Sequence, residues 1–340
     1  MFDFFSDTRT KPSRAMREAV LAAEVGDEQS GEDPTTNALC ERVAALLGKQ
    51  SAVFLPSGTM CNEVAIRVHI RAGEEIICER NCHVVGFEGG GPAALSGAMI
   101  KALDGERGML TPAQVHAAIT AGSRYTPASR LLTVEQTANM AGGAVWPVDQ
   151  LAEVGAIARD AGLATHMDGA RLMNAVVQSG VSAAEHCAGY DTCWIDFSKG
   201  LGAPVGAVLA GPGDFIERAW RVKQQIGGAM RQSGVLAAMC LHALDHNVAR
   251  LADDHALAQT IARDLGTMGK VAEIRPVDTN IVIFDLAAHS PTAAELVALL
   301  ERDGIRIGAF AERRVRIVTH LDVGPEAGEA LCASLARHLA

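Results

Sequence analysis

An aspartate and a lysine, Asp168 and Lys199, each follow an apolar run of strand type. Because the carboxyl ends of parallel strands meet at one edge of a sheet, we predict that both side chains face one crevice. A lysine there can form a Schiff base with pyridoxal phosphate, and an aspartate can keep the pyridine nitrogen of that cofactor protonated. Considered alone, however, an aspartate and a lysine more often form a structural salt bridge.

Further residues favour the cofactor over the salt bridge. The tripeptide Ser57-Gly58-Thr59 lies between an expected strand and an expected helix, where free backbone N–H groups and the helix dipole favour a phosphate. Arg231, next to a glycine pair, is a candidate second cation for that phosphate. His83 is a candidate to stack on a flat aromatic ring. Each signal is weak alone, because many turns contain this tripeptide and a lone histidine is usually an ordinary loop residue.

Strand-type and helix-type segments alternate through the first 210 residues, and they must position these side chains. Helices are expected at Asn62–Ile70, Thr111–Ile119 and Val148–Ala161. Strands are expected at Ala52–Leu55, Glu75–Cys78, Met99–Ala102, Arg130–Glu135, Ala164–Met167, Thr192–Phe197 and Ala207–Ala210. This alternation predicts an α/β fold, in which a mostly parallel sheet carries helices on both faces.

The pattern changes in the last third of the chain. It is helical from Gly234 to Leu265, and a helix is expected at Thr292–Asp303 and another from Pro325. Strands are expected at Val271–Ile274, Asn280–Asp285, Ile305–Phe310 and Val315–Thr319. We therefore predict an N-terminal arm (residues 1–35), a large domain (36–245) and a small C-terminal α+β domain (246–340).

The composition excludes several classes of protein. The 340 residues carry 30 basic and 40 acidic side chains, a formal net charge of −10, which argues against nucleic acid as the main partner. No apolar run reaches the roughly 18 residues of a membrane span, and the start lacks the pattern of a secretory signal. The eight cysteines form no CxxC pair, so we interpret them as buried thiols in a reducing cytoplasm, not as disulfides or a metal site.

Seven stretches, in order and spread over nearly the whole chain, carry a family resemblance. They are SDTRTKPSRAM (6–16), VGDEQSGEDPTTNAL (25–39), FLPSGTMCNEVA (54–65), HMDGARLMNAVV (166–177), SKGLGAPVGAVLAGPGDFIERA (198–219), GGAMRQSGVLAA (227–238) and RIVTHLDV (316–323). With these stretches the chain resembles the L-threonine aldolases of the β-eliminating lyase group, which are fold type I pyridoxal-phosphate enzymes.

The resemblance implies roles for individual residues. Lys199 would form the Schiff base, His83 would stack on the cofactor, and Asp168 would pair with its nitrogen. The phosphate would be bound by Ser57, Gly58, Thr59 and Arg231, and the substrate carboxylate by Ser6, Arg171 and Arg316. The resemblance also implies a homo-oligomer, typically a tetramer built from two dimers that share active sites, in which Arg231 acts on a neighbouring subunit's phosphate.

Four positions depart from the family pattern. Ser30 replaces a tyrosine, Ala138 a histidine, and Gln224 a lysine, while Tyr125 aligns with a histidine that assists at the substrate β-hydroxyl. These departures spare the cofactor residues and concern the side-chain end of the substrate. The base that takes the β-hydroxyl proton is therefore open between His83, a water molecule and another group.

The predicted function is an aldehyde-lyase that cleaves β-hydroxy-α-amino acids to glycine and an aldehyde. One alternative keeps the cofactor but changes the reaction to β-elimination, racemisation or transamination of another amino acid. Another is a catalytically silent homologue that binds pyridoxal phosphate, against which the joint presence of Lys199, Asp168, Arg171 and His83 argues.

Overall fold

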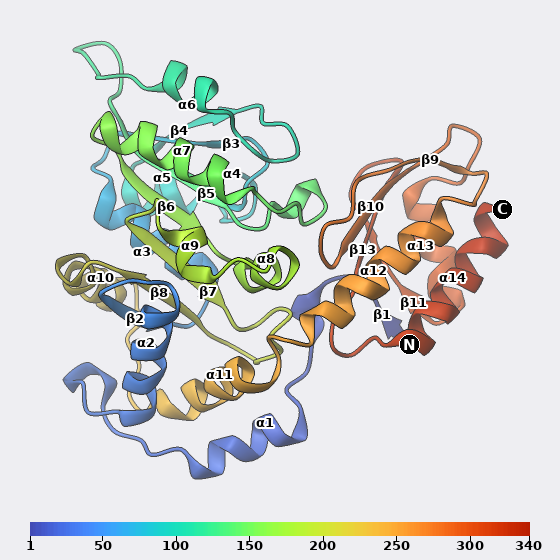
Figure 1. The fold of residues 1–340 in the computed structure, drawn as a ribbon, viewed down its shortest axis with the longest axis horizontal. Coiled ribbons are helices and arrows are strands. Elements are labelled where there is room, and N and C mark those ends of the chain that lie inside the picture. Colours follow the sequence, from blue (N-terminus) through green and yellow to red (C-terminus); the bar gives the residue numbers. More distant parts are fainter.

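A computed structural model of the chain describes residues 1–340 and contains a seven-stranded sheet in the order β2-β8-β7-β6-β5-β3-β4 (Figure 1). The β8 strand runs antiparallel to its neighbours β2 and β7, and the other neighbouring pairs are parallel. The predicted mostly parallel sheet is therefore confirmed. The strands are β2 (Ser51–Leu55), β3 (Glu75–Glu79), β4 (Met99–Leu103), β5 (Ser129–Glu135), β6 (Ala164–Asp168), β7 (Thr192–Asp196) and β8 (Ala207–Gly211).

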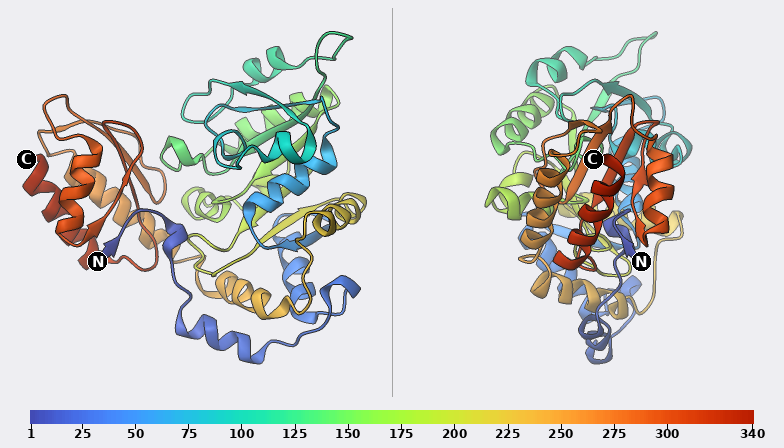
Figure 2. Two further views of the ribbon diagram at one scale, coloured as in Figure 1. Left: turned by 180° about the vertical axis from the view of Figure 1, so that it is seen from behind. Right: turned by 90° about the vertical axis from the view of Figure 1, so that its right-hand side faces the viewer.

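Helices cover both faces of this sheet, as predicted: α7, α8 and α9 lie in front of it in Figure 1, and α3 lies in front in the reverse view of Figure 2. Local sequence sets their starts, since Ser57 caps α3 and Thr111 forms a capping box with Gln114 at α6. The helices are α2 (Pro34–Leu46), α3 (Gly58–His69), α4 (His83–Gly86), α5 (Gly91–Ser96), α6 (Pro112–Ala118), α7 (Val148–Asp160), α8 (Leu172–Ser179), α9 (Ala183–Cys187), α10 (Gly213–Gln225) and α11 (Gly234–His246).

A second, antiparallel sheet in the C-terminal part has the order β12-β13-β10-β9. Its own apolar core includes Phe284, Leu300 and Leu331. The expected strand Ile305–Phe310 is in fact two short strands, β11 and β12. The elements are α12 (Leu251–Leu265), β9 (Val271–Ile274), β10 (Ile281–Leu286), α13 (Ala293–Arg302), β11 (Ile305–Arg306), β12 (Gly308–Ala309), β13 (Arg314–Val318) and α14 (Pro325–Leu339).

The N-terminal segment contacts both parts of the molecule (Figure 2). Its first strand, β1 (Phe2–Asp3), pairs in parallel with β11, and Phe4 is buried in the C-terminal core. Farther along, α1 (Arg14–Ala19) packs on α11 and buries Met16 in the core of the large sheet. No helix in the structure has both the length and the apolarity needed to cross a membrane.

Candidate active site

A cavity of about 190 Å³ lies at the carboxyl ends of β5, β6 and β7, where the N-terminal segment and the C-terminal part meet the large sheet. Six of the residues singled out from the sequence line it: Ser6, His83, Asp168, Arg171, Lys199 and Arg316. The remaining lining residues are Thr8, Phe87, Glu135, Asn139, Ala170 and Phe310. The strand-end argument therefore placed Asp168 and Lys199 at one cavity correctly.

Lys199 follows β7 and is largely buried, with 16% of its side chain exposed. Its Nζ lies 3.0 Å from Asp196 Oδ2, so its salt-bridge partner is Asp196 and not Asp168. Asp168 is buried at the end of β6 and accepts hydrogen bonds from Asn62 Nδ2 at 2.8 Å and from the backbone N–H of Ala170 at 3.0 Å. Burial raises the pKa of Asp168, against the opposing charges of Lys199 and His83.

His83 begins α4 and is fixed at two atoms. Its backbone N–H donates to Glu135 Oε2 at 2.8 Å, and its ring Nδ1 lies 2.6 Å from Glu88 Oε1. Burial lowers the pKa of His83, but the Glu88 hydrogen bond and the charge of Asp168 outweigh it, so the pKa is raised overall. Because Glu88 holds Nδ1, the other ring nitrogen, Nε2, is the one left for a ligand.

Glu135 was not singled out from the sequence, although it ends β5 just as Asp168 ends β6. Its carboxylate accepts the backbone N–H groups of His83 and of Asn139, the latter at 2.7 Å. Burial and the charge of Asp168 raise the pKa of Glu135 to about 7. The strand-end rule, applied to every strand, would have found it.

The two arginines differ in their partners. Arg171 forms a two-pronged ion pair with Asp7, its Nε and Nη2 each 2.7 Å from a carboxylate oxygen. Arg316 has no carboxylate partner; it donates to Asn139 Oδ1 at 3.1 Å, lies over the Phe310 ring at 4.2 Å, and its buried Nε has no hydrogen-bond partner. Burial and the charge of Arg171 lower the pKa of Arg316 to about 10.

The residues expected to bind phosphate lie outside this cavity. Ser57 caps α3 by accepting the backbone N–H of Met60 at 3.2 Å. Gly58 faces Trp194, and a Cβ atom there would lie 2.2 Å from Cη2 of that indole. Arg231 is exposed and pairs with Asp27 at 2.7 Å. The roles of Ser57, Gly58, Thr59 and Arg231 stay predictions.

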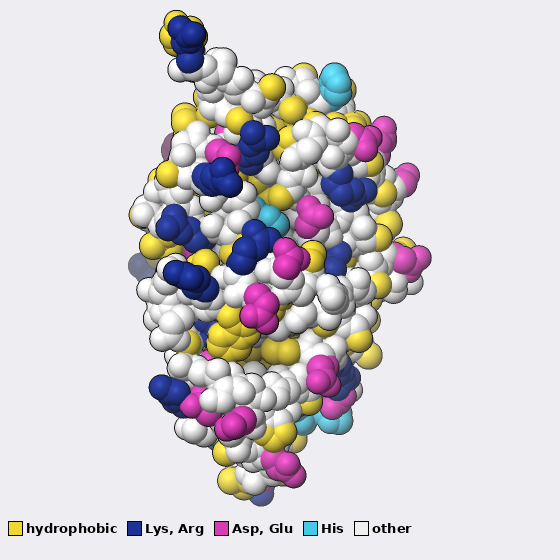
Figure 3. All heavy atoms as spheres, turned by 90° about the vertical axis from the view of Figure 1, so that its left-hand side faces the viewer, with side chains coloured by type: hydrophobic (Ala, Val, Ile, Leu, Met, Phe, Trp, Pro, Cys, Tyr) yellow, Lys and Arg dark blue, Asp and Glu magenta, His cyan; other side chains and the backbone are white.

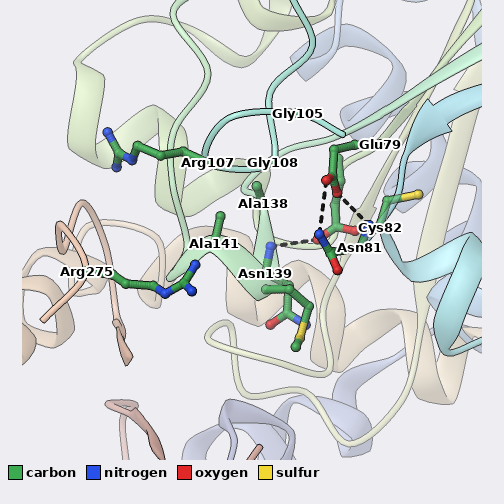
Figure 4. A pocket seen from close by; sticks show the side chains of 12 residues that line it. Glu79, Asn81, Cys82, Gly105, Arg107, Gly108, Ala138, Asn139, Ala141 and Arg275 are labelled. Atoms are coloured by element: carbon green, nitrogen blue, oxygen red, sulfur yellow. Dashed lines mark hydrogen bonds between the residues drawn. The ribbon is translucent and has the colours of Figure 1, made fainter. Parts of the chain in front are cut away.

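Three of the four departures from the family pattern are exposed and do not line the cavity: Ser30, Tyr125 and Gln224. Tyr125 is 86% exposed on the loop between α6 and β5, which projects from the large domain in Figure 1 and forms the tip at the top of Figure 3. The fourth, Ala138, lines a smaller cavity of about 80 Å³ (Figure 4). That cavity shares Glu135 and Asn139 with the larger one.

Comparison with known proteins places the chain among related sequences. A family model described as beta-eliminating lyase matches residues 3–289. A low specificity L-threonine aldolase from Escherichia coli K12 is 42% identical over 327 residues, which cover 96% of each chain. Low-specificity L-threonine aldolase 1 from Arabidopsis thaliana is 40% identical over 94% of this chain and 90% of the relative.

Solved structures share the fold at lower identity. A threonine aldolase from Leishmania major superposes with a TM-score of 0.86 at 19% identity, covering 100% of both chains. A serine palmitoyltransferase from Sphingomonas wittichii gives a TM-score of 0.77 at 17% identity, over 99% of this chain and 86% of the other. These likenesses support the fold type I architecture, a large mostly parallel sheet followed by a smaller antiparallel one.

Proposed function

This chain belongs to the beta-eliminating lyase family, a pyridoxal-phosphate family, and we propose that it cleaves β-hydroxy-α-amino acids to glycine and an aldehyde. Candidate substrates are L-threonine, L-allo-threonine and phenylserine. The observation that carries the proposal is the cavity in which a lysine, a buried carboxylate, an imidazole and an arginine without a carboxylate partner converge.

The residues present fit the cofactor. Lys199 would supply the amine that bonds to the cofactor aldehyde, Asp168 would hold a proton on the pyridine nitrogen, and His83 would pack against the ring. Asn62 and the backbone of Ala170 hydrogen-bond to Asp168 and favour its ionised form, which that role requires. When bound, pyridoxal phosphate accepts the electron pair of the broken Cα–Cβ bond.

The carboxylate of the amino acid is assigned to Arg316, with Arg171 and Ser6 beside it. Arg316 is the stronger candidate, because Nε and Nη2 of Arg171 already donate hydrogen bonds to the carboxylate of Asp7. Asn139 bridges the two guanidinium groups, since its Oδ1 accepts from Arg171 Nη1 at 3.2 Å and from Arg316 Nη1 at 3.1 Å. A carboxylate bound there would be held in a fixed orientation relative to His83 and Lys199.

The base at the β-hydroxyl is assigned to His83, acting directly or through a water molecule. It lines the cavity, whereas the exposed Tyr125 lies outside it in this chain. Its Nδ1 is held by the Glu88 carboxylate, which leaves Nε2 to accept the β-hydroxyl proton as the Cα–Cβ bond breaks.

One experiment separates the candidate functions. The purified protein, supplied with pyridoxal phosphate, is incubated in turn with L-threonine, L-allo-threonine and phenylserine, and glycine and aldehyde are both quantified. Equal yields of the two products are expected. Keto acid or ammonia, or loss of chirality without cleavage, would favour transamination, elimination or racemisation, and a yellow protein with no turnover would indicate a silent homologue.

We further propose that the chain assembles as a homo-oligomer in which Arg231 reaches a neighbouring subunit's phosphate. Exposed apolar side chains on and around α4, α5 and β4 support a subunit contact: Val85, Phe87, Leu95, Met99 and Ile100. Light scattering after size-exclusion chromatography should give a multiple of 35.6 kDa. Arg231→Ala should weaken cofactor binding, and a monomeric protein with normal cofactor affinity would contradict this assembly.

A further inference from the structure

The side chain of Asn62, on α3, is buried between the cavity residues and the large sheet. Its Nδ2 donates to Asp168 Oδ2 and to Glu88 Oε1, both at 2.8 Å. Its Oδ1 accepts the indole N–H of Trp194 at 2.7 Å and lies 3.1 Å from His166 Nε2. An amide has two N–H donors and two acceptor lone pairs, so every one of its hydrogen-bonding positions is used.

The orientation of this amide is fixed by its neighbours. The indole of Trp194 can only donate, so the atom that faces it must be Oδ1. Burial and the charge of His69 lower the pKa of His166 to about 3, so that ring is neutral. The His166 Nδ1 lies 2.8 Å from Thr192 Oγ1, a hydroxyl that can donate to it, which leaves the ring proton on Nε2, facing Asn62. Turning the amide over would place donors against donors.

Through Glu88, the same amide also reaches His83. The Glu88 side chain is fully buried, and its Oε1 accepts from Asn62 and lies 2.6 Å from His83 Nδ1. Asn62 therefore bonds to Asp168 directly and to His83 through one intermediate carboxylate. These are the two residues assigned to the pyridine nitrogen and to the ring face of the cofactor.

We propose that Asn62 is a positioning residue, which sets Asp168 and His83 in one arrangement before the cofactor binds. A single buried amide then couples two cofactor contacts that come from different strands and helices, and Glu88 transmits the coupling. The inference rests on the proposed cofactor roles of Asp168 and His83. A site preorganised in this way binds its ligand without first ordering its own side chains.

A double-mutant cycle tests the coupling. The dissociation constant of pyridoxal phosphate is measured by visible absorbance for the wild type, Asn62→Leu, Glu88→Gln and the double variant. We expect each single change to weaken binding about tenfold, roughly the effect of one lost hydrogen bond to a charged group. Asn62 acts on His83 through Glu88, so the two changes should not be independent. The loss of affinity in the double variant should therefore be clearly smaller than the product of the two single losses.

A second measurement uses the cofactor-free protein and reports on His83 alone. Its ring is titrated by NMR, with Asp168, Glu88, Glu135 and Lys199 as the charged groups around it. Glu88→Gln keeps an acceptor oxygen but removes the charge, so the pKa of His83 should fall. Asn62→Leu should also move this titration, although Asn62 does not contact His83.

Gln136→Leu is the matched control. Gln136 is another fully buried amide, but its side chain bonds to Trp146 and His186 and not to the cavity residues. This variant should lose stability while keeping wild-type cofactor affinity and His83 titration. If Asn62→Leu does not fold, Asn62→Ala replaces it, since it removes both donors without adding a charge beside Asp168 and Glu88.

The two proposals fail in different ways. Multiplicative effects in the double variant, unchanged cofactor affinity in the Asn62 variants, or an unmoved His83 titration would each overturn the positioning role. A different result would overturn the proposed reaction and leave the positioning role standing: cofactor binding that shows the expected coupling between Asn62 and Glu88, but no cleavage of any hydroxy amino acid.

Discussion

Arg171 and Arg316 carry the same guanidinium group in different electrostatic settings. The charge of Arg171 is neutralised by Asp7, whereas no carboxylate of the chain pairs with Arg316, which is therefore available to bind the substrate carboxylate. Because lysine cannot reproduce the planar fork, Arg316→Lys should lose about 1.5–3 kcal/mol of substrate interaction, or roughly 10- to 150-fold in kcat/KM. Steady-state kinetics with L-threonine checks this.

Arg314→Lys is the control for that change, because Arg314 lies on the same strand, β13, but pairs with Asp285 away from the cavity. It should leave kcat/KM unchanged. Arg171→Lys should lower both kcat/KM and the free energy of unfolding, since it also breaks the fork to Asp7. Wild-type kinetics in the Arg316 and Arg171 variants would remove both from the substrate site.

The raised pKa of His83 gives the reaction a defined pH dependence. A base must be unprotonated, so kcat/KM should rise with pH through a pKa above the ordinary 6.5 of histidine. His83→Asn should lower turnover by about 10²-fold or more, the usual contribution of a general base. Tyr125→Phe is the control and should change little, because Tyr125 is exposed. A pH profile limited near 10, abolished by Tyr125→Phe, would assign the base to Tyr125 instead.

Glu63 on α3 should make the protein less stable as the pH rises. Both its carboxylate oxygens are buried without a hydrogen-bond partner, and burial and the charge of Glu88 raise the pKa of Glu63 to about 8. The folded state therefore binds a proton that the unfolded state, with a pKa near 4.5, has released. Stability falls between those two pH values as the pH rises.

Replacing this carboxyl by a neutral amide should remove that loss. We expect the free energy of unfolding of Glu63→Gln to be about 1–3 kcal/mol higher than that of wild type at pH 8, the range for one unsatisfied buried polar group. The two proteins should converge toward pH 5. Urea unfolding at both pH values measures the difference, and a constant difference across pH would show that Glu63 stays ionised in the fold.

At the scale of secondary structure, apolar periodicity and turn residues were enough to predict the seven strands of the large sheet and the helices α3, α6, α7 and α11 to within a few residues, but α2, α8 and α10 were missed. The strand-end rule then placed Asp168 and Lys199. The same reasoning could not predict that β8 runs antiparallel to β7, because an apolar run of residues has the same pattern whether its strand is parallel or antiparallel to its neighbour. It also could not find Phe310, which reaches the cavity from the distant hairpin of β12 and β13.

The start of α3 depends on one glycine. A Cβ atom at Gly58 would lie 2.2 Å from the Trp194 indole, which Asn62 holds in place. Gly58→Ala should therefore shift α3 and destabilise the fold by about 1–3 kcal/mol, the range for overpacking, and weaken cofactor binding as well. Gly269→Ala, with nothing within 4 Å, is the control and should leave both quantities unchanged. Normal cofactor affinity in Gly58→Ala would argue against a phosphate site at this turn.

At the scale of the whole molecule, Asp7 joins the N-terminal segment to both of the other parts. Its carboxylate accepts from Arg171 in the large domain and, at 3.1 Å, from Asn280 Nδ2 next to β10. Burial raises the pKa of Asp7, but the paired Arg171 outweighs it and holds the pKa well below its ordinary value of 3.8. The stability this gives is fully present above pH 3.8 and is lost as the pH falls below it.

Removing the charge of Asp7 should lower the stability of the fold and weaken substrate binding together. Asp7→Asn leaves Arg171 as a buried, uncompensated cation, a change that costs about 3–5 kcal/mol in comparable pairs. We expect a lower urea midpoint and a raised KM for L-threonine, because Arg171 no longer fixes Asn139 and through it Arg316. Glu18→Gln is the control: its pair with Arg14 is exposed, so unfolding should change by less than about 1 kcal/mol. If Asp7→Asn changed stability without changing KM, the N-terminal segment would serve only to hold the two domains together.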